Sequence, residues 1–295
     1  MNPQTGHLLA ICRHLVDPDA TVVTTHAGHA GTTILQAATR HGHVIVKTHR
    51  GPDRHRQEIH AYQQWTPTLG ARTPRLIATC DNPPAIVITA IAGTPLAKLQ
   101  LDRTEEQKAH RQAGELLRDL HAAAPPRSQP DMTRWLAQRG ADWLRLAEPI
   151  LPANQRTVIE HHLRALADLG PITAVPCHLD YAPRNLLWTA DHTTCVIDFE
   201  HARYDLAARD LVRMARHVWT GRPELEEAFL DGYGPLTETD RHVIKHGAHL
   251  DILTAAVRAT GQRLPGPTSG IWDSPVADGE SEPTPAYGGI HASPT

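Results

Sequence analysis

Three polar side chains follow one another at spacings suited to phosphoryl transfer. Asp180 and Asn185 lie five positions apart, and Asp198 follows thirteen positions after Asn185. In such a set one carboxylate orients or deprotonates an acceptor hydroxyl, while oxygen ligands hold Mg²⁺ against a triphosphate as charge develops. The alternative is that Asp180 and Asn185 only cap turns, as these residue types often do. Three such residues beside apolar strands favour the chemical interpretation.

These residues form the pattern His-x-Asp-x-x-x-x-Asn, followed after a short hairpin by a second Asp. With this pattern the chain, from about residue 22 to about residue 261, resembles the aminoglycoside phosphotransferase family of small-molecule kinases. The resemblance implies that Asp180 is the catalytic base and that Asn185 and Asp198 are the Mg²⁺ ligands. It also implies that His178 belongs to the catalytic set by supporting the geometry of the loop.

Two positions depart from related patterns. Leu179 stands where members of this family often have glycine, and Glu200 stands where protein kinases have the glycine after Asp-Phe. Acidic residues are familiar at the second position in the resembled family. We therefore expect Glu200, and Arg184 of the first motif, to be candidates for facing the substrate or the metal.

Lysine is rare in this chain and occurs only at positions 47, 98, 108 and 245. Lys47 ends a β-branched stretch, which matches the strand lysine that pairs with the α- and β-phosphates of a bound nucleotide. An ordinary strand-end lysine at the surface is the alternative. The only carboxylates between residues 47 and 80 are Asp53 and Glu58. Because Asp53 stands where a helix N-cap would be, we expect Glu58 to be the partner of Lys47.

The remaining nucleotide contacts are expected in loops. Gly28 and Gly31 lie between the first two strands, where a turn could cover phosphates, although two glycines in a hairpin often serve only the turn. The resemblance implies backbone contacts to the nucleotide base near Thr89 and Ile91, between the two expected lobes. Backbone contacts do not depend on side-chain type, so the sequence does not distinguish ATP from GTP. We expect ATP with Mg²⁺ as cofactor, and GTP remains an alternative.

The apolar periodicity changes along the chain and predicts two lobes. Strand-like segments come first, at residues 21–25, 32–38, 43–47, 75–79 and 85–90, with a helix at 53–65. Helical patterns follow, beginning at a capping-box signature at residues 104–107 and continuing at 132–147, 154–169, 209–220, 225–233 and 239–261. They are interrupted by one short β unit at 186–188 and 194–197.

These elements predict an α+β fold that is protein-kinase-like and two-lobed. A small N-terminal lobe, with an antiparallel β-sheet and a helix, would span residues 1–90 and bind the nucleotide. A larger, mostly helical lobe would span residues 91–264 and hold the catalytic loop and the acceptor site. Residues 265–295 are rich in Pro, Gly, Ser and Thr without apolar periodicity, which predicts a disordered tail.

Composition excludes several other classes of protein. The formal net charge is −3 at pH 7, so the chain has no excess positive charge for a nucleic acid partner. No apolar run approaches the length of a membrane span, and we expect neither a membrane partner nor a secretion signal. Four cysteines without metal-ligand spacing predict reduced thiols. We therefore expect a cytoplasmic protein.

Acidic residues recur in two further places. Asp205 and Asp210 match a pair that, in the resembled family, usually anchors the loop through backbone hydrogen bonds, and we expect a structural role for them. Residues 224–240 contain six carboxylates. Such a region could attract a polycationic antibiotic, or it could be a solvated helical face.

Three functions fit the sequence. The first is an O-phosphotransferase acting on a hydroxyl of an antibiotic, aminoglycoside-like or other, in resistance, self-resistance or tailoring. The second keeps the chemistry with a metabolic acceptor such as a choline-, homoserine- or ketosamine-like compound. The third, a non-catalytic nucleotide-binding pseudokinase, ranks last because no polar motif residue is lost. A protein kinase is disfavoured because few residues separate Asp198 from Asp205, which leaves little room for a peptide-docking loop.

Overall fold

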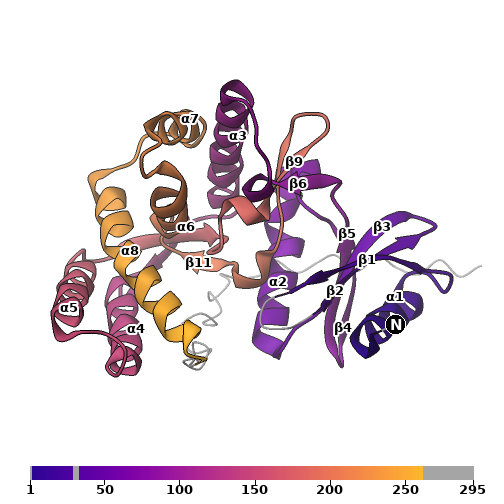
Figure 1. Ribbon diagram of the computed structural model, residues 1–295, viewed down its shortest axis with the longest axis horizontal. Helices are drawn as coiled ribbons and strands as arrows, with labels where there is room; N and C mark the ends of the chain where they lie inside the picture. The colour runs from indigo at the N-terminus through magenta and orange to yellow at the C-terminus, as the bar shows by residue number, and fades with distance from the viewer. Residues whose placement is uncertain (1, 29–32, 262–295) are drawn as a thin grey trace, which may run out of the picture. The chain divides into compact units, whose positions relative to one another are not determined.

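The computed structural model describes residues 2–28 and 33–261, and its largest sheet comes first along the chain (Figure 1). The sheet is antiparallel with five strands in the order β1-β2-β3-β5-β4. In that order they are β1 (Thr21–Ala27), β2 (Thr33–Thr39), β3 (Gly42–Thr48), β5 (Pro84–Thr89) and β4 (Leu76–Asp81). The predicted antiparallel sheet is therefore confirmed.

The alternation of β3 decides which side chains face which helix. Helix α1 (Pro3–Leu15) packs on one face of the sheet, where its apolar residues share a buried cluster with Val44 and Val46. Because successive side chains of a strand point to opposite faces, Lys47 is directed to the other face. Helix α2 (Pro52–Gln64) packs there against β4 and β5.

Two small three-stranded sheets follow, and the sequence predicted them only in part. The β unit appears as β9 (Leu186–Thr189) and β10 (Thr194–Val196), but β6 (Gly93–Pro95) joins it by pairing with β9. The third sheet has the order β11-β8-β7 and was not predicted; its strands are β7 (Arg127–Gln129), β8 (Ile172–Cys177) and β11 (Arg203–Asp205). The three-residue strands β7 and β11 are too short to show a period of two, and the six-residue β8 was missed as well.

The predicted helices of the second half are all present. They are α3 (Arg103–His121), α4 (Met132–Ala147), α5 (Ala153–Ala167), α6 (Ala208–Met214), α7 (Pro223–Tyr233) and α8 (Glu238–Ala259). The capping box was placed wrongly. Asp102, not Thr104, caps α3 by accepting the N–H of Glu105, and a capping box stands instead at Thr237 and Asp240 of α8. The predicted tail at 265–295 lies outside the described residues.

No helix in the described part of the chain is both long and apolar enough to cross a membrane.

Helices α3 and α7 approach each other through two glycines. A Cβ added at Gly114 would lie 2.0 Å from the carbonyl oxygen of Phe229, and one added at Gly232 would lie 2.0 Å from that of Arg111. Both contacts are to backbone, which cannot rotate away as a flexible side chain could. The two helix backbones therefore touch, and only glycine fits at these positions.

We expect Gly114→Ala to lower the free energy of unfolding by about 2 kcal/mol or more, although alanine is the better helix former. The reason is the backbone clash, and urea unfolding measures the change. Gly51→Ala is the matched control, because an added Cβ there meets no atom within 4 Å. Equal midpoints for the two variants would show that α3 and α7 can move apart without cost.

A buried histidine on α3 makes stability depend on pH. Burial lowers the pKa of His110 to about 4, and its Nδ1 has no hydrogen-bond partner among the residues that the structure describes. As the pH falls, His110 therefore takes up a proton near pH 6.5 in the unfolded chain but only near pH 4 in the folded chain. The free energy of unfolding is therefore unaffected by this group above pH 6.5 and decreases as the pH falls from 6.5 to about 4.

His110→Leu should remove this part of the pH dependence. Between pH 7 and pH 4 the wild type should lose about 3 kcal/mol more than the variant, as measured by urea unfolding at each pH. Parallel stability curves for the two proteins would contradict the assignment.

Candidate active site

The ammonium group of Lys47 joins three separate parts of the chain. Its Nζ lies 2.7 Å from Oε1 of Glu58 on α2 and 2.7 Å from Oδ1 of Asp198, which follows β10. Glu58 is fully buried and also contacts His49 at 2.6 Å through its other oxygen. The structure thus brings together Lys47, Glu58 and Asp198. The bridging role of His49 was missed, although it stands only two residues after Lys47, directly after the end of β3.

The charges of this group stabilise one another. Burial alone would lower the pKa of Lys47, but Glu58 and Asp198 outweigh it and hold that pKa well above its usual range. Lys47 in turn lowers the pKa of Asp198 to about 2, against the opposing effect of burial. Lys47 is therefore a permanent cation and Asp198 a permanent anion at neutral pH.

A cluster of three rings in edge and tilted contact positions Asp198. Its backbone is left-handed, with φ of 70°, and the next residue, Phe199, is completely buried. The ring of Phe199 lies 5.4 Å from that of Tyr62 on α2 and 4.8 Å from that of His178. Because Phe199 is fixed between these rings, the carboxylate that precedes it is held toward Lys47.

His178 is a positioning residue in this arrangement. Its Nε2 lies 3.0 Å from the carbonyl oxygen of Ile197, and its Nδ1 accepts the N–H of Asp180 at 3.2 Å. A carbonyl only accepts, so the ring carries its proton on Nε2. Burial lowers the pKa of His178, which keeps this neutral form. The ring therefore ties the start of the loop to the residue before Asp198.

The side chain of Asn185 is locked onto Asp180. Its Nδ2 donates to Oδ2 of Asp180 at 2.8 Å and to the Asp180 carbonyl at 2.9 Å. The carbonyl of Asn185 also accepts the N–H of Ile197 at 3.0 Å, so the loop and the segment before Asp198 run together. Since the amide nitrogen is engaged, the amide oxygen Oδ1 is the atom available to a cation.

Two arginines contact the other carboxylate oxygen of Asp180. Arg184, from the same loop, and Arg213, from α6, both form ion pairs with Oδ1. Arg213 continues to Asp251 of α8, with Nε 3.3 Å from Oδ1. The sequence interpretation missed Arg213 and Asp251. Arg213 could have been found, because it stands three positions after Asp210 on a predicted helix and so shares its face.

Asp210 anchors the catalytic loop through backbone hydrogen bonds, as the sequence predicted. Its carboxylate accepts the N–H of His178 at 2.8 Å and the N–H of Leu179, and His121 donates to it at 3.1 Å. Leu179 has φ of 59°, the left-handed region that glycine enters without strain. This explains why glycine suits that position, and it shows that Asp210 stabilises a strained leucine. Asp205 accepts the N–H of Leu206 at 2.8 Å and also pairs with Arg203 at 3.0 Å.

The structure places the other predicted residues less decisively. Gly28 follows β1, whereas Gly31 lies outside the described residues. The N–H and hydroxyl of Thr89 are already bonded to the backbone of Arg75, and Ile91 lies between β5 and β6. Glu200 is half-buried, and its carbonyl accepts from Arg54 at 3.3 Å. That Glu200 faces the substrate or the metal stays a prediction, as do the contacts of Thr89 and Ile91 to the nucleotide base.

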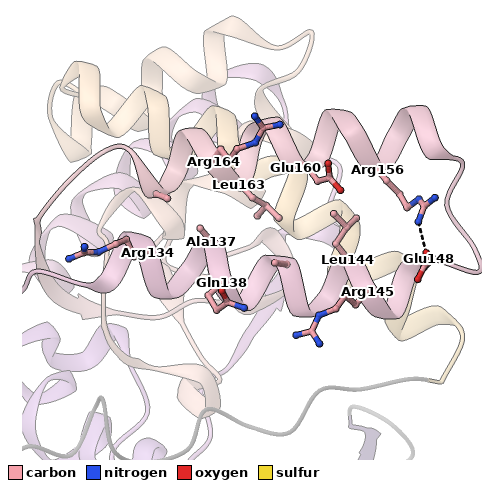
Figure 2. A pocket seen from close by; sticks show the side chains of 12 residues that line it. Arg134, Ala137, Gln138, Leu144, Arg145, Glu148, Arg156, Glu160, Leu163 and Arg164 are labelled. Carbon is pink, nitrogen blue, oxygen red and sulfur yellow. Dashed lines mark hydrogen bonds and ion pairs between the residues drawn. The ribbon is translucent and has the colours of Figure 1, made fainter.

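A groove of about 780 Å³ lies elsewhere, between α4 and α5 (Figure 2). Arg134 and Arg145 rise from one helix and Arg156 and Arg164 from the other, around an apolar floor that includes Leu163. None of the predicted site residues lines this groove. It is therefore separate from the set around Asp180.

One group of possible metal ligands was found in the described residues. A ligand atom from each of His121, Cys177 and Asp210 lies within 4.8 Å of the others, and all three residues are buried. Each is already hydrogen-bonded, since Cys177 donates to the carbonyl of Asp205 and His121 to Asp210. Burial also raises the pKa of the Cys177 thiol well above its usual range. The three residues therefore fit a hydrogen-bonded structural cluster better than a metal centre.

Comparison with known proteins agrees with this geometry. The model of a family described as "Phosphotransferase enzyme family" matches residues 22–245, which is more than half of the chain. Among solved structures, the AMP-bound spectinomycin phosphotransferase APH(9)-Ia has a TM-score of 0.63 at 16% identity, covering 87% of this chain and 89% of that one. Aminoglycoside-3'-phosphotransferase of type VIII gives 0.58 at 20% identity, covering 85% and 100%.

A kinase of another substrate class has a similar fold. Choline kinase LicA from Streptococcus pneumoniae gives a TM-score of 0.60 at 17% identity, covering 88% of this chain and 94% of that one. A search among curated sequences found no significant match. At these identities the structural likeness shows the fold, and it confirms the predicted kinase-like α+β class.

The anchoring role of Asp210 predicts a coupling with Leu179. We expect Asp210→Asn to lower the free energy of unfolding by about 2–4 kcal/mol, because it replaces a buried acceptor of several hydrogen bonds. Leu179→Gly should change it by less than about 1 kcal/mol, since relief of strain offsets the flexibility of glycine. In the double variant, glycine should recover part of the loss, as measured by urea unfolding. Strict additivity of the two changes would show that Asp210 does not hold Leu179 in its conformation.

Proposed function

Because the chain belongs to the phosphotransferase enzyme family and is a small-molecule kinase, we propose a specific reaction for it. In this reaction it transfers the terminal phosphoryl group of ATP to a hydroxyl of an antibiotic. The observation that carries the proposal is the ion-pair chain Glu58–Lys47–Asp198, with both links at 2.7 Å and with Glu58 and Lys47 buried. It fixes one cation for the phosphates beside one carboxylate for a metal. GTP remains an alternative donor, because the base contacts expected near Thr89 and Ile91 come from backbone groups.

The residues present fit Mg²⁺. Asn185 offers an amide oxygen, because its nitrogen is bonded to Asp180, and Asp198 offers a carboxylate that stays ionised at neutral pH. Oxygen ligands of this kind, with the triphosphate, are what Mg²⁺ prefers. When bound, the ion would neutralise charge on the phosphates.

Each of the other side chains would have its own role in phosphoryl transfer. Lys47 would bind the α- and β-phosphates, with Glu58 fixing its direction. Asp180 would orient the acceptor hydroxyl and take its proton. The acceptor oxygen forms a bond to the γ-phosphorus while the bond from that phosphorus to the bridging oxygen of ADP breaks. Arg184 is a candidate for stabilising the charge on the transferred group, and His178 would keep the loop in place.

We assign nucleotide binding to residues 1–90 and acceptor binding to residues 91–264. The antibiotic acceptor, aminoglycoside-like or other, would be phosphorylated in resistance, self-resistance or tailoring, in the cytoplasm where ATP is supplied. A metabolic kinase acting on a choline-, homoserine- or ketosamine-like compound is the second candidate, and the likeness to choline kinase favours it. A non-catalytic pseudokinase ranks below both, because every polar motif residue is present.

We expect Asp180→Asn to lower turnover by about 10³-fold, because it removes the proton acceptor. Nucleotide affinity should change by less than about threefold. The assay is ADP release with ATP and Mg²⁺ against pooled hydroxyl-bearing antibiotics and pooled metabolites, with product masses locating the phosphate. Asp131→Asn, an exposed carboxylate before α4, is the control. Undiminished turnover by Asp180→Asn would reject the assignment of the base.

A further inference from the structure

Cationic groups gather on one side of Asp180. Arg184 and Arg213 contact its Oδ1, and Arg216 lies on the next turn after Arg213. Both Arg213 and Arg216 form ion pairs with the same carboxylate, that of Asp251 on α8. Three guanidinium groups therefore meet two carboxylates, which leaves an excess of positive charge beside the proposed base.

A departure from regular helix carries one of these arginines. Helix α6 continues into a π-helical turn, Ala215–Trp219, which carries Arg216 and His217. Such turns are rare and often occur at functional sites. The side chains of Arg213 and Arg216 are each about a quarter exposed, so both are partly buried and still reachable from solvent.

Arg184 and Arg213 contact the carboxylate oxygen of Asp180 that is not bonded to Asn185. The Oδ2 oxygen of Asp180 faces Asn185, whose backbone leads to Asp198 and Lys47, the nucleotide half of the proposed site. In an in-line displacement the acceptor oxygen approaches opposite the leaving group. An acceptor whose hydroxyl reaches the Oδ1 oxygen of Asp180 would therefore lie close to Arg213, which shares its partner Asp251 with Arg216.

The acidic residues at 224–240 do not counterbalance this charge. Glu224 pairs with Arg222 at 2.6 Å, and Asp231 pairs with Arg111 of α3 at 3.1 Å. Asp240 is engaged in the capping box of α8. Three of the six carboxylates of this region therefore have partners of their own, which favours a solvated face over an attractor for a polycation.

We propose that the acceptor carries an oxyanion group near its reactive hydroxyl, and that Arg216, together with Arg213, binds that group. The inference rests on the proposed function. Guanidinium groups match carboxylates and phosphates in planar, paired hydrogen bonds, and the position of Asp251 shows that a carboxylate fits between these two. A polycationic acceptor would instead bring like charges together at Asp180.

The first test sorts acceptors by charge. Hydroxyl-bearing compounds are grouped into four pools: carboxylates, phosphate esters, neutral compounds and polycations such as aminoglycosides. Each pool is incubated with the full chain, ATP and Mg²⁺, and products that Asp180→Asn fails to make are identified by mass. We expect a phosphorylated product from the carboxylate pool or from the phosphate-ester pool. The pool that yields it identifies the type of oxyanion that is bound.

The second test assigns the recognition to Arg216. Arg216→Gln should raise KM for the acidic acceptor by about 10- to 100-fold, the loss of one charge-assisted interaction, with a smaller effect on kcat. The wild type should discriminate against the uncharged ester or amide of the same acceptor, whereas the variant should treat acid and derivative alike. A merely structural role of Arg216 would weaken both equally. Arg145→Gln is the matched control, because Arg145 also pairs with a carboxylate, Asp142, on α4.

The outcomes separate the two levels of the proposal. Asp180-dependent product only from neutral or polycationic pools would overturn the oxyanion inference and leave the kinase function standing. No Asp180-dependent product from any pool would contradict the proposed function. Binding to the complex with a non-hydrolysable ATP analogue, read by ligand-observed NMR, then decides the inference. Acidic compounds that bind the wild type and not Arg216→Gln support it, and equal binding to both proteins overturns it.

Discussion

The buried ammonium of Lys47 is the interaction on which the rest of the site depends. It ties β3 of the first sheet to Glu58 on α2 and to Asp198 after β10, so one side chain fixes three elements at once. Glu58 is completely buried, and a buried carboxylate without its partner would cost several kcal/mol. The same ion pairs that set the positions of the elements therefore also keep Lys47 protonated and Asp198 ionised.

The catalytic loop is held by a second, independent set of contacts. Asp210 accepts the N–H groups of His178 and Leu179, while His178 bonds to the backbone before Asp198. Leu179 is held in a left-handed conformation as a result. Positioning of Asp180 thus comes from backbone hydrogen bonds that converge from α6 and from the end of β10, and side-chain packing of Phe199 closes the arrangement.

Charge is distributed unevenly around Asp180. The side toward Lys47 holds a cation balanced by two carboxylates, whereas the side toward α6 and α8 holds three arginines against Asp180 and Asp251. The first arrangement suits a metal-bound triphosphate, because the metal brings its own positive charge. The second suits an acceptor that brings negative charge. The fold shared with antibiotic and choline kinases does not specify this second side, since its charge is set by individual side chains.

Local sequence determined the parts of this protein that depend on neighbours in the chain. The motif from His178 to Asn185, the strand that ends near Lys47 and the long helices were predictable, because spacing and periodicity record them directly. The choice of Glu58 followed from the scarcity of carboxylates in its segment. Strands β6, β7 and β11 were not predictable, since three residues show no period and their pairing partners are distant in sequence. Only the tertiary structure placed Arg213, Arg216 and Asp251 together, because contact between α6 and α8 depends on packing and leaves no pattern in either helix alone.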